Sequence, residues 1–318
     1  MPTRVFLTVD TELAWRHHAR ALDPRAIVQR SLEPAGVGIS YQLGMLARHG
    51  LKACFFVDPM PALTFGLDPI RQIVEAILAA GQEVQLHLHP NWTGATAGDG
   101  GAAYSRFHLV EYDPAEQRDL IAGAAELLRA AGAPPPIAFR AGSYAANDDT
   151  LAALAALGFA YDSSHNGAEH PWPSAIDLPA DRIAPIGRAG LIELPVTAIE
   201  DRPGSLRNFQ ICALSAGEMR AALDHAAGAD HAAVTIVSHS FELANRAGTR
   251  PNAVHVARFE ALCRLLAERA DALPTTHFAD RPSLSLDRSD RPLGPSVLRT
   301  GWRRAEQLWS NMVEERAA

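Results

Sequence analysis

Short apolar segments alternate with helical patterns along most of the chain, and this alternation restricts the possible folds more than any other feature. Seven segments have the length and the β-branched or aromatic content of strands, and several are apolar throughout, as in strands that are buried on both faces. The predicted strands are Val5–Val9, Lys52–Val57, Glu83–His87, Ile137–Phe139, Phe159–Tyr161, Leu191–Val196 and Ala233–Ser238. Repeated strand–helix–strand units indicate parallel strands with right-handed crossovers.

The helical segments between these strands begin at recognisable signals. Asp68-Pro69 and Asp113-Pro114 each place a capping residue before a proline. Ser215 with Glu218 three residues later forms a capping box. We therefore predict an α/β fold in which the strands form a closed or nearly closed β/α barrel. An open doubly wound sheet is the alternative, but no G-x-G-x-x-G follows the first strand to favour a dinucleotide.

The length of 318 residues fits one barrel with an appendage better than two domains. We predict a barrel over residues 1–280 and a C-terminal extension over residues 281–318. The extension is rich in Arg, Pro and Ser, and then forms an amphipathic helix from Ser296 to Glu315. Trp302, Trp309 and Met312 share one stripe of this helix. The stripe either packs on the barrel or contacts a second copy of the chain in a homodimer.

Composition excludes several classes of protein. The chain carries 29 Lys and Arg against 36 Asp and Glu, a net charge of -7, so it lacks the basic face that nucleic acid requires. The three cysteines are far apart and lie in apolar runs, which indicates reduced core residues. No apolar stretch is long enough for a transmembrane helix. The first residues enter a strand at once, without a signal-peptide pattern, so we expect a cytoplasmic protein.

Ionisable residues gather where the predicted strands end. Active sites of β/α barrels lie at the carboxyl ends of the strands, so polar residues at those positions are the expected mark of function. Five strands end in such groups: Asp10-Thr11-Glu12, His87-Leu88-His89, Arg140, Asp162 and Ser238-His239. A purely structural barrel has no need of this clustering, and the sequence therefore predicts an active site.

The residue types indicate metal-assisted hydrolysis. Carboxylates and imidazoles without a thiolate suit Zn²⁺, and also Fe²⁺, Co²⁺ or Ni²⁺, and argue against Ca²⁺ or Mg²⁺ alone. Three protein ligands leave a position for water, whose pKa the metal lowers while it polarises a carbonyl. A second carboxylate can then accept a proton, and a histidine on the opposite side can donate one to a leaving amine.

Five segments, read in order, resemble the motifs of one protein family. They are FLTVDTE, CFFVDP, GQEVQLHLHP, FRAGSY and IVSHSFEL, and they extend from Val5 to about Asp280. By these motifs the chain is similar to the polysaccharide deacetylase superfamily (NodB homology, like carbohydrate esterase family 4), and within it to the divergent branch without a signal sequence.

The resemblance implies a distorted seven-stranded β/α barrel of the NodB type. It also implies hydrolysis of a non-peptide C–N bond, with loss of an acyl group, usually acetyl, from a carbohydrate-type amide. In the catalytic set it makes Asp10 the base, Arg140 the residue that orients it, and His239 the acid. Glu12, His87 and His89 would hold a divalent metal, with zinc favoured and cobalt, nickel or iron as alternatives. Either a glycan or a small amide would be the substrate.

Three departures from the family pattern leave alternatives open. Asp10-Thr11-Glu12 replaces the usual pair of adjacent aspartates, so Asp10 could instead bind the metal while Glu12 acts as base. His87 and His89 are two residues apart instead of one helical turn, and Asn91 occupies the position one turn on. Ala141-Gly142-Ser143 replaces the usual proline of the third motif.

Three other functions remain to be weighed. Relatives with altered motifs hydrolyse small cyclic amides and ureides, so an amidohydrolase of that kind is one alternative. A catalytically inactive sugar-binding homologue is another. A glycoside hydrolase that used Asp10 and Glu12 fails on spacing, because its carboxyl groups must lie on opposite sides of a sugar bond, about 5 to 9 Å apart. Residues two apart on one strand lie on the same side.

Overall fold

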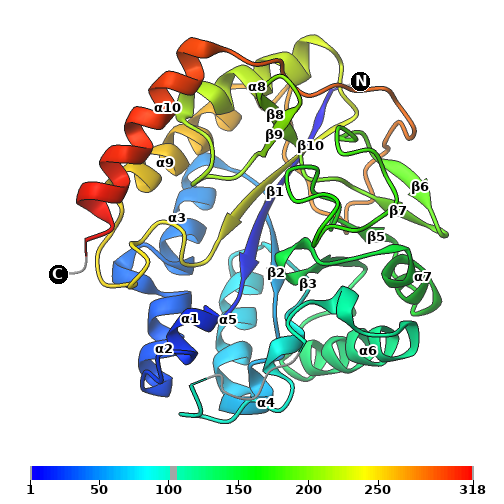
Figure 1. Ribbon diagram of the computed structural model, residues 1–318, viewed down its shortest axis with the longest axis vertical. Coiled ribbons are helices and arrows are strands. Elements are labelled where there is room, and N and C mark those ends of the chain that lie inside the picture. The colour runs from blue at the N-terminus through cyan, green and yellow to red at the C-terminus, as the bar shows by residue number, and fades with distance from the viewer. Residues whose placement is uncertain (1, 101–105, 317–318) are drawn as a thin grey trace.

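The computed structural model, which describes residues 2–100 and 106–316, has an α/β fold around a curled sheet (Figure 1). The sheet has eight strands in the order β10-β1-β2-β3-β4-β5-β7-β6. Seven of them are parallel: β1 Arg4–Thr11, β2 Cys54–Val57, β3 Glu83–Leu88, β4 Ala138–Ala141, β5 Tyr161–Asp162, β7 Leu191–Glu193 and β10 Ala233–His239. The prediction of a distorted seven-stranded β/α barrel is therefore confirmed, in the form of a half-barrel.

Three strands lie outside the predicted set. β6 (Ile186–Arg188) pairs antiparallel with β7 at the edge of the main sheet, and β8 (Ala198–Arg202) pairs with β9 (Ser205–Asn208) in a separate hairpin. β6 and β9 contain no buried residue. Because the sequence prediction relied on apolar runs, it could not detect β6 and β9, which are partly exposed.

Helices lie in most of the connections between the parallel strands, and two more, α9 and α10, follow β10. Their bounds are α1 Trp15–His18, α2 Pro24–Leu32, α3 Ile39–His49, α4 Ala62–Phe65, α5 Asp68–Ala79, α6 Pro114–Ala130, α7 Asp148–Ala156, α8 Ala216–Gly228, α9 Ala253–Glu268 and α10 Val297–Trp309. The predicted helix cap at Asp113 before α6 and the predicted capping box at Ser215 before α8 are both present. Asp68 is different: it lies inside the first turn of α5, after Leu67, and its carboxylate binds Arg71 at 2.7 Å instead of capping the helix.

Both faces of the strands carry apolar side chains, and those of the inner face fill the bottom of the barrel. Outward side chains such as Leu7 and Val9 join the large core between the sheet and the helices. Inward side chains Phe6 and Phe56 pack instead on Phe278, whose ring centroid lies 4.7 Å and 5.6 Å from theirs. Phe278 thus fills the inside of the half-barrel at the amino ends of the strands. The carboxyl ends are left for polar residues.

The open side of the half-barrel is partly closed by the segment after β7. The Leu194 N–H donates to the carbonyl of Asp162 beside β5, and the Thr197 N–H donates to the carbonyl of Thr235 in β10. The chain therefore passes from one edge of the sheet to the other before it forms β8. This path brings the hairpin and the residues after it to the carboxyl end of β10.

The C-terminal helix α10 lies against α8 and α9 and continues into a π-helical turn, Ser310–Glu314 (Figure 1). Arg303 is buried and pairs with Asp201 and with Glu218. The division of the chain into a barrel over residues 1–280 and an extension over residues 281–318 stays a prediction. In the described part of the chain, no helix is both long and apolar enough to cross a membrane.

Candidate active site

The two-residue period of the strands places the predicted site residues on the inside of the barrel. In β1, Phe6 points inward to the floor, so Asp10 and Glu12 further along the same face point into the mouth. The same parity carries His87 in β3 and Arg140 in β4 to the inside. Register completes the arrangement, because Asp10 lies opposite His239 in β10, and His87 lies opposite Arg140.

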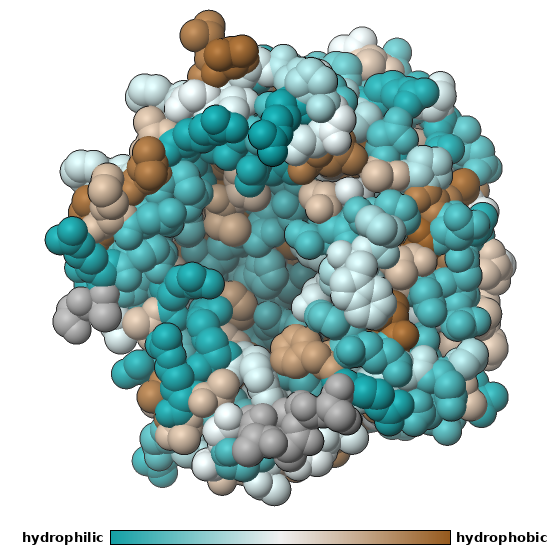
Figure 2. Space-filling model, viewed as in Figure 1, coloured by the Kyte–Doolittle hydropathy of each residue, from teal (hydrophilic) through white to brown (hydrophobic). Residues whose placement is uncertain are grey.

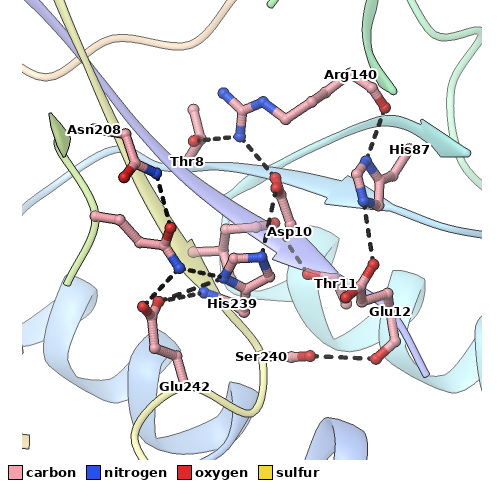
Figure 3. Close-up of polar contacts among 12 residues, drawn as sticks. Thr8, Asp10, Thr11, Glu12, His87, Arg140, Asn208, His239, Ser240 and Glu242 are labelled. Atoms are coloured by element: carbon pink, nitrogen blue, oxygen red, sulfur yellow. Dashed lines mark hydrogen bonds and ion pairs between the residues drawn. The ribbon is translucent and has the colours of Figure 1, made fainter. Parts of the chain in front are cut away.

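Glu12, His87 and His89 form one cluster. The Oε2 atom of Glu12 lies 3.2 Å from Nε2 of His87 and also contacts Nε2 of His89 (Figure 3 shows the first of these contacts). The three ligand atoms lie within 4.8 Å of one another. Burial would raise the pKa of Glu12, but the charges and hydrogen bonds of the two histidines outweigh it and lower that pKa well below its usual value. A carboxylate and two imidazoles that converge in this way match the donor set of a Zn²⁺-type site.

Two features hold the imidazoles of this cluster in place. The Nδ1–H of His87 donates to the backbone carbonyl of Arg140 at 2.8 Å, which leaves Nε2 free to accept or to bind a cation. The ring of His89 lies directly over Gly142. A Cβ atom at Gly142 would be 2.5 Å from that ring, closer than real side chains approach. Glycine at this position therefore makes room for the second imidazole.

Asp10 and Arg140 form a buried ion pair beside the cluster. Arg140 donates from Nη1 to Oδ1 of Asp10 and to the hydroxyl of Thr8, each at 2.7 Å. Its other donors bind the carbonyl and the hydroxyl of Ser163, at 3.1 Å and 3.0 Å. The guanidinium also lies 4.5 Å from the ring centre of Phe56. All the nitrogens of the guanidinium thus have partners, and the second oxygen of Asp10 is left on the side of His239.

His239 faces that second oxygen. Its Nε2 lies 4.0 Å from Oδ2 of Asp10, and its Nδ1 lies 3.5 Å from Oε2 of Glu242 (Figure 3). Burial alone would lower the pKa of His239. The hydrogen bond and charge of Glu242, helped by Asp10 and Glu12, outweigh burial and raise that pKa to about 9. The same pairing lowers the pKa of Glu242 to about 2, against its burial.

The structure thus brings together all six residues that the sequence predicted, in two groups. Glu12, His87 and His89 form one, and Asp10, Arg140 and His239 the other. The grouping favours Glu12 over Asp10 as the carboxylate that could hold a metal, because Asp10 is occupied by Arg140. The functional role of each residue stays a prediction.

Sequence reasoning missed three residues at the site. Glu242 follows His239 by three positions, within a motif already singled out, so this spacing was an available signal. Gln210 donates to Glu242 at 2.9 Å and lies 3.3 Å from Nδ1 of His239, but it arrives from the loop after β9 and carries no local signal. Asp58, at the tip of β2, is fully buried near His89, and burial raises the pKa of its carboxyl to about 7.

The rim of the site is built from loops. A long insertion, residues 91–112, follows β3, and its Tyr104 lies outside the described residues. Trp92 is buried against Trp15 and so forms part of the core instead. His108 lies near enough to His89 for their charges to interact, and it contacts the exposed Trp172 at 6.0 Å between ring centres. Figure 2 shows a hollow near the centre of this face, lined mainly by hydrophilic side chains.

The family model for polysaccharide deacetylase matches residues 39–161, which include His87, His89 and Arg140. The resemblance drawn from the sequence motifs is therefore confirmed. The match does not extend to Asp10, Glu12 or His239.

Individual relatives are distant. A peptidoglycan deacetylase-like protein, FGM2 from Gibberella zeae, is 28% identical over 133 residues, which are 41% of this chain and 33% of that protein. The chain thus spans about a third of the length of that relative. Among solved structures, a Mycobacterium smegmatis protein assigned to the polysaccharide deacetylases has a TM-score of 0.57 and 21% identity over 91% of this chain and 95% of its own. A family 4 carbohydrate esterase from Streptomyces lividans has a TM-score of 0.43 and 14% identity over 92% and 98%. The first of these structures shows the fold.

Proposed function

We propose that the chain is a metal-dependent hydrolase that removes an acetyl group from a carbohydrate-type amide. One observation carries the proposal. The mouth of the barrel holds two separate sets of groups: Glu12 with two imidazoles, and Asp10 between a guanidinium and His239. The first set is suited to a cation, and the second to moving protons. The match of residues 39–161 to the polysaccharide deacetylase family model supports the choice of substrate class.

Glu12, His87 and His89 would hold the cation. Their donor atoms converge, His87 has its second nitrogen fixed by a carbonyl, and the lowered pKa of Glu12 keeps its carboxylate charged. Zinc is the favoured metal, with cobalt, nickel or iron as alternatives. Bound there, the metal would polarise the amide carbonyl and lower the pKa of a water molecule.

Asp10 would act as the general base. A buried carboxylate is costly unless a positive partner and hydrogen bonds compensate it, and Arg140 provides both at Oδ1. The other oxygen, Oδ2, is not the one that Arg140 binds, and it would accept a proton from water. Arg140 is a positioning residue in this scheme, because it acts on the reaction only through Asp10.

His239 would act as the general acid. With a pKa of about 9, its imidazole carries its proton at neutral pH, and so it can donate that proton to the leaving nitrogen as the amide bond breaks. It lies across the cavity mouth from the Glu12 cluster, on the far side of Asp10 (Figure 3). Glu242 stabilises the charged imidazole and fixes its orientation.

The test combines metal content with a panel of substrates. Purified protein is stripped with a chelator and assayed for acetate release from chitooligosaccharides and N-acetyl amino sugars, and for opening of cyclic ureides, before and after Zn²⁺, Co²⁺ or Ni²⁺ is added. We expect acetate release that the metal restores, and the loss of one bound equivalent in His87→Ala. Metal-independent activity would refute the metal role. Turnover of ureides alone would make the protein an amidohydrolase, and metal binding without turnover of any substrate would make it an inactive homologue.

A cytoplasmic location is part of the same proposal. It would direct the enzyme to a soluble or lipid-linked glycan precursor or to a small amide. Fractionation of cells that express the chain under its own promoter, followed by immunoblotting, tests this location. Recovery outside the cytoplasm would contradict it.

A further inference from the structure

The outward face of α10 and the following π-helical turn exposes an unusual amount of apolar surface. Six of the large apolar residues that are exposed among those described lie here, with exposed fractions from 54% to 89%: Val297, Leu298, Trp302, Leu308, Trp309 and Met312. Apolar residues scattered singly on a surface are ordinary, but a contiguous patch on one helix face marks an interaction site.

The spacing of this face is regular. Leu298, Trp302, Ala305, Trp309 and Met312 follow one another at intervals of four, three, four and three residues. This is the heptad pattern of coiled coils, in which the side chains of one helix pack into the spaces between the side chains of another. The pattern continues through the turn at residues 310–314, where Met312 is still 54% exposed.

The opposite face of the helix is fixed to the rest of the chain. Arg303 pairs with Asp201 and Glu218, and Glu306 pairs with Arg258 at 2.8 Å. The hydroxyl of Ser310, in the turn that follows, accepts a hydrogen bond from Asn252 at 2.9 Å. Because these polar contacts hold the helix in one orientation, the apolar stripe cannot turn inward to join the core. The stripe is presented outward as a stable surface.

We propose that this face binds the same face of a second copy of the chain, in an antiparallel pair centred on Ala305. A two-fold axis makes both copies use the same patch, so the patch must be complementary to itself. With the axis at Ala305, Gly301 of one copy opposes Trp309 of the other, and Leu298 opposes Met312. Trp309 thus meets a residue without a side chain, Leu298 and Met312 meet at the ends of the pair, and the smallest apolar residue of the stripe sits at the axis.

Charge also favours a second copy. A membrane surface is the competing partner, but helices that lie on membranes have polar faces rich in Lys and Arg. Here the flanks carry both signs, and the whole chain has a net charge of -7, which an anionic membrane repels.

The size of the face sets the expected strength. The helix and turn are about 27 Å long and, with side chains, about 10 Å wide. Two tryptophans at about 150–250 Å² each, with the neighbouring aliphatic side chains, give about 500 Å² per copy. A pair would then bury about 1,000 Å², close to the lower limit for a specific interface. We therefore expect dissociation in the micromolar range.

Analytical ultracentrifugation of the full chain from about 1 to 100 µM tests the pair directly. We expect a monomer–dimer equilibrium that Leu308→Glu and Ala305→Glu weaken by at least about tenfold, because each change buries a charge at the seam. Leu63→Glu is the matched control: Leu63 is 53% exposed, against 61% for Leu308, but it lies in α4 and should leave the equilibrium unchanged. Circular dichroism melting verifies that each variant is folded.

The register is tested by cross-linking. Ala305→Cys should join two copies through a short bis-maleimide linker, whereas Leu298→Cys should not, because antiparallel copies hold the two residues at 298 about 20 Å apart. A chain that stays monomeric throughout, or a dimer insensitive to both glutamate variants, would overturn the proposal. Efficient cross-linking of Leu298→Cys would overturn the antiparallel geometry. Monomers that bind phosphatidylglycerol vesicles, and lose that binding in Leu308→Glu, would assign the face to a membrane. None of these variants touches the site residues, so the outcome is independent of the hydrolase activity.

Discussion

Replacing Glu242 by glutamine removes the charge that holds the proton on His239 while it keeps the shape of the side chain. Glu242 accepts from the backbone N–H groups of His239 and Cys212, at 2.9 Å and 2.8 Å, and contacts Nδ1 of His239. The amide of glutamine can accept on one side only. The variant therefore loses the ion pair and leaves one backbone N–H without a partner. We expect two separable effects, one on the pKa of His239 and one on folding stability.

The magnitude of the first effect follows from the pKa values. The pKa of His239 is about 9, against 6.5 for an unperturbed imidazole, and that of Glu242 is about 2, against 4.5. Each net difference corresponds to about 3 kcal/mol and remains after the opposite charge of the partner has outweighed burial. Without Glu242, burial opposes the weaker effects of Asp10 and Glu12, and we expect the pKa of His239 to fall to near 6.5. At pH 8.5 the protonated fraction then falls from about three-quarters to about 1%.

The assay is the pH profile of kcat for acetate release, measured on metal-saturated enzyme. Glu242→Gln should lie within about twofold of the parent near pH 6 and fall to about one-seventieth of it near pH 8.5, so the alkaline limb moves about 2.5 pH units toward acid. Glu75→Gln, which removes one charge from the exposed face of α5, should leave the profile unchanged. Glu242→Asp, which keeps the charge, should restore much of the alkaline activity.

The second effect is measured by urea unfolding. The direction of each pKa shift determines how the stability difference between the variant and the parent depends on pH. Because the pKa of His239 is raised on folding, its contribution is complete below about pH 6.5 and is lost as the pH rises through about 9. The contribution of Glu242 is present above about pH 4.5 and is lost as the pH falls through about 2. The variant should therefore be less stable than the parent at pH 6 by more than it is at pH 10. A uniform loss of kcat with an unmoved alkaline limb would refute the role of Glu242 and leave it a purely structural residue.

Three further changes test other parts of the site. Gly142→Ala should weaken Zn²⁺ binding, measured by calorimetry, by at least about tenfold, because the added Cβ would displace His89. Gly123→Ala is the control, because Gly123 lies in a helix with open space around it and its change should leave the affinity unaltered. Equal Zn²⁺ affinities of the two variants would contradict this role of Gly142. Burial gives Asp58 a pKa of about 7 in the folded protein against 3.8 in the unfolded chain, so metal-free protein should lose stability as the pH rises through that window. Asp58→Asn should flatten this loss in urea unfolding between pH 5 and 8, and parallel slopes would show that Asp58 is not responsible. Trp172→Ala should raise KM for a chitooligosaccharide about fivefold through lost ring stacking, with little change for a monosaccharide, and an unaltered KM would remove Trp172 from the substrate path.

The sequence predicted those parts of the fold in which burial gives a continuous run of apolar residues. All seven parallel strands are largely buried, so their apolar runs identified them. The position of Phe278 inside the half-barrel was not predictable in this way. Its contacts with Phe6 and Phe56 span most of the chain, and no local pattern records them. The exposed strand β6 was missed for the complementary reason, because a strand without a buried face has no apolar period to detect.

The site was predictable to the extent that strand tips define it. Asp10, His87 and Arg140 lie at positions that parity and register fix, so the sequence placed them correctly with no knowledge of distances. Gln210 was not predictable, since it reaches His239 only because the chain between β7 and β10 crosses the open side of the barrel. Such a contact depends on the path of a loop, which the side chains of the strands do not determine.

The three departures from the family motifs become one arrangement when they are placed in the structure. Two imidazoles two residues apart at the end of β3 point to the same side, so His87 and His89 both reach the mouth of the barrel without a helical turn between them. The second imidazole needs space beside β4, and Gly142 supplies it where a Cβ would lie 2.5 Å from the ring. A carboxylate from the end of β1 must then reach both imidazole rings while Asp10 stays paired with Arg140. Glu12 does this, because it lies two residues after Asp10 and its side chain is one methylene longer than that of aspartate. A change at any one of the three positions should therefore be tolerated only with changes at the others, and restoring a family-like residue singly should weaken the cluster.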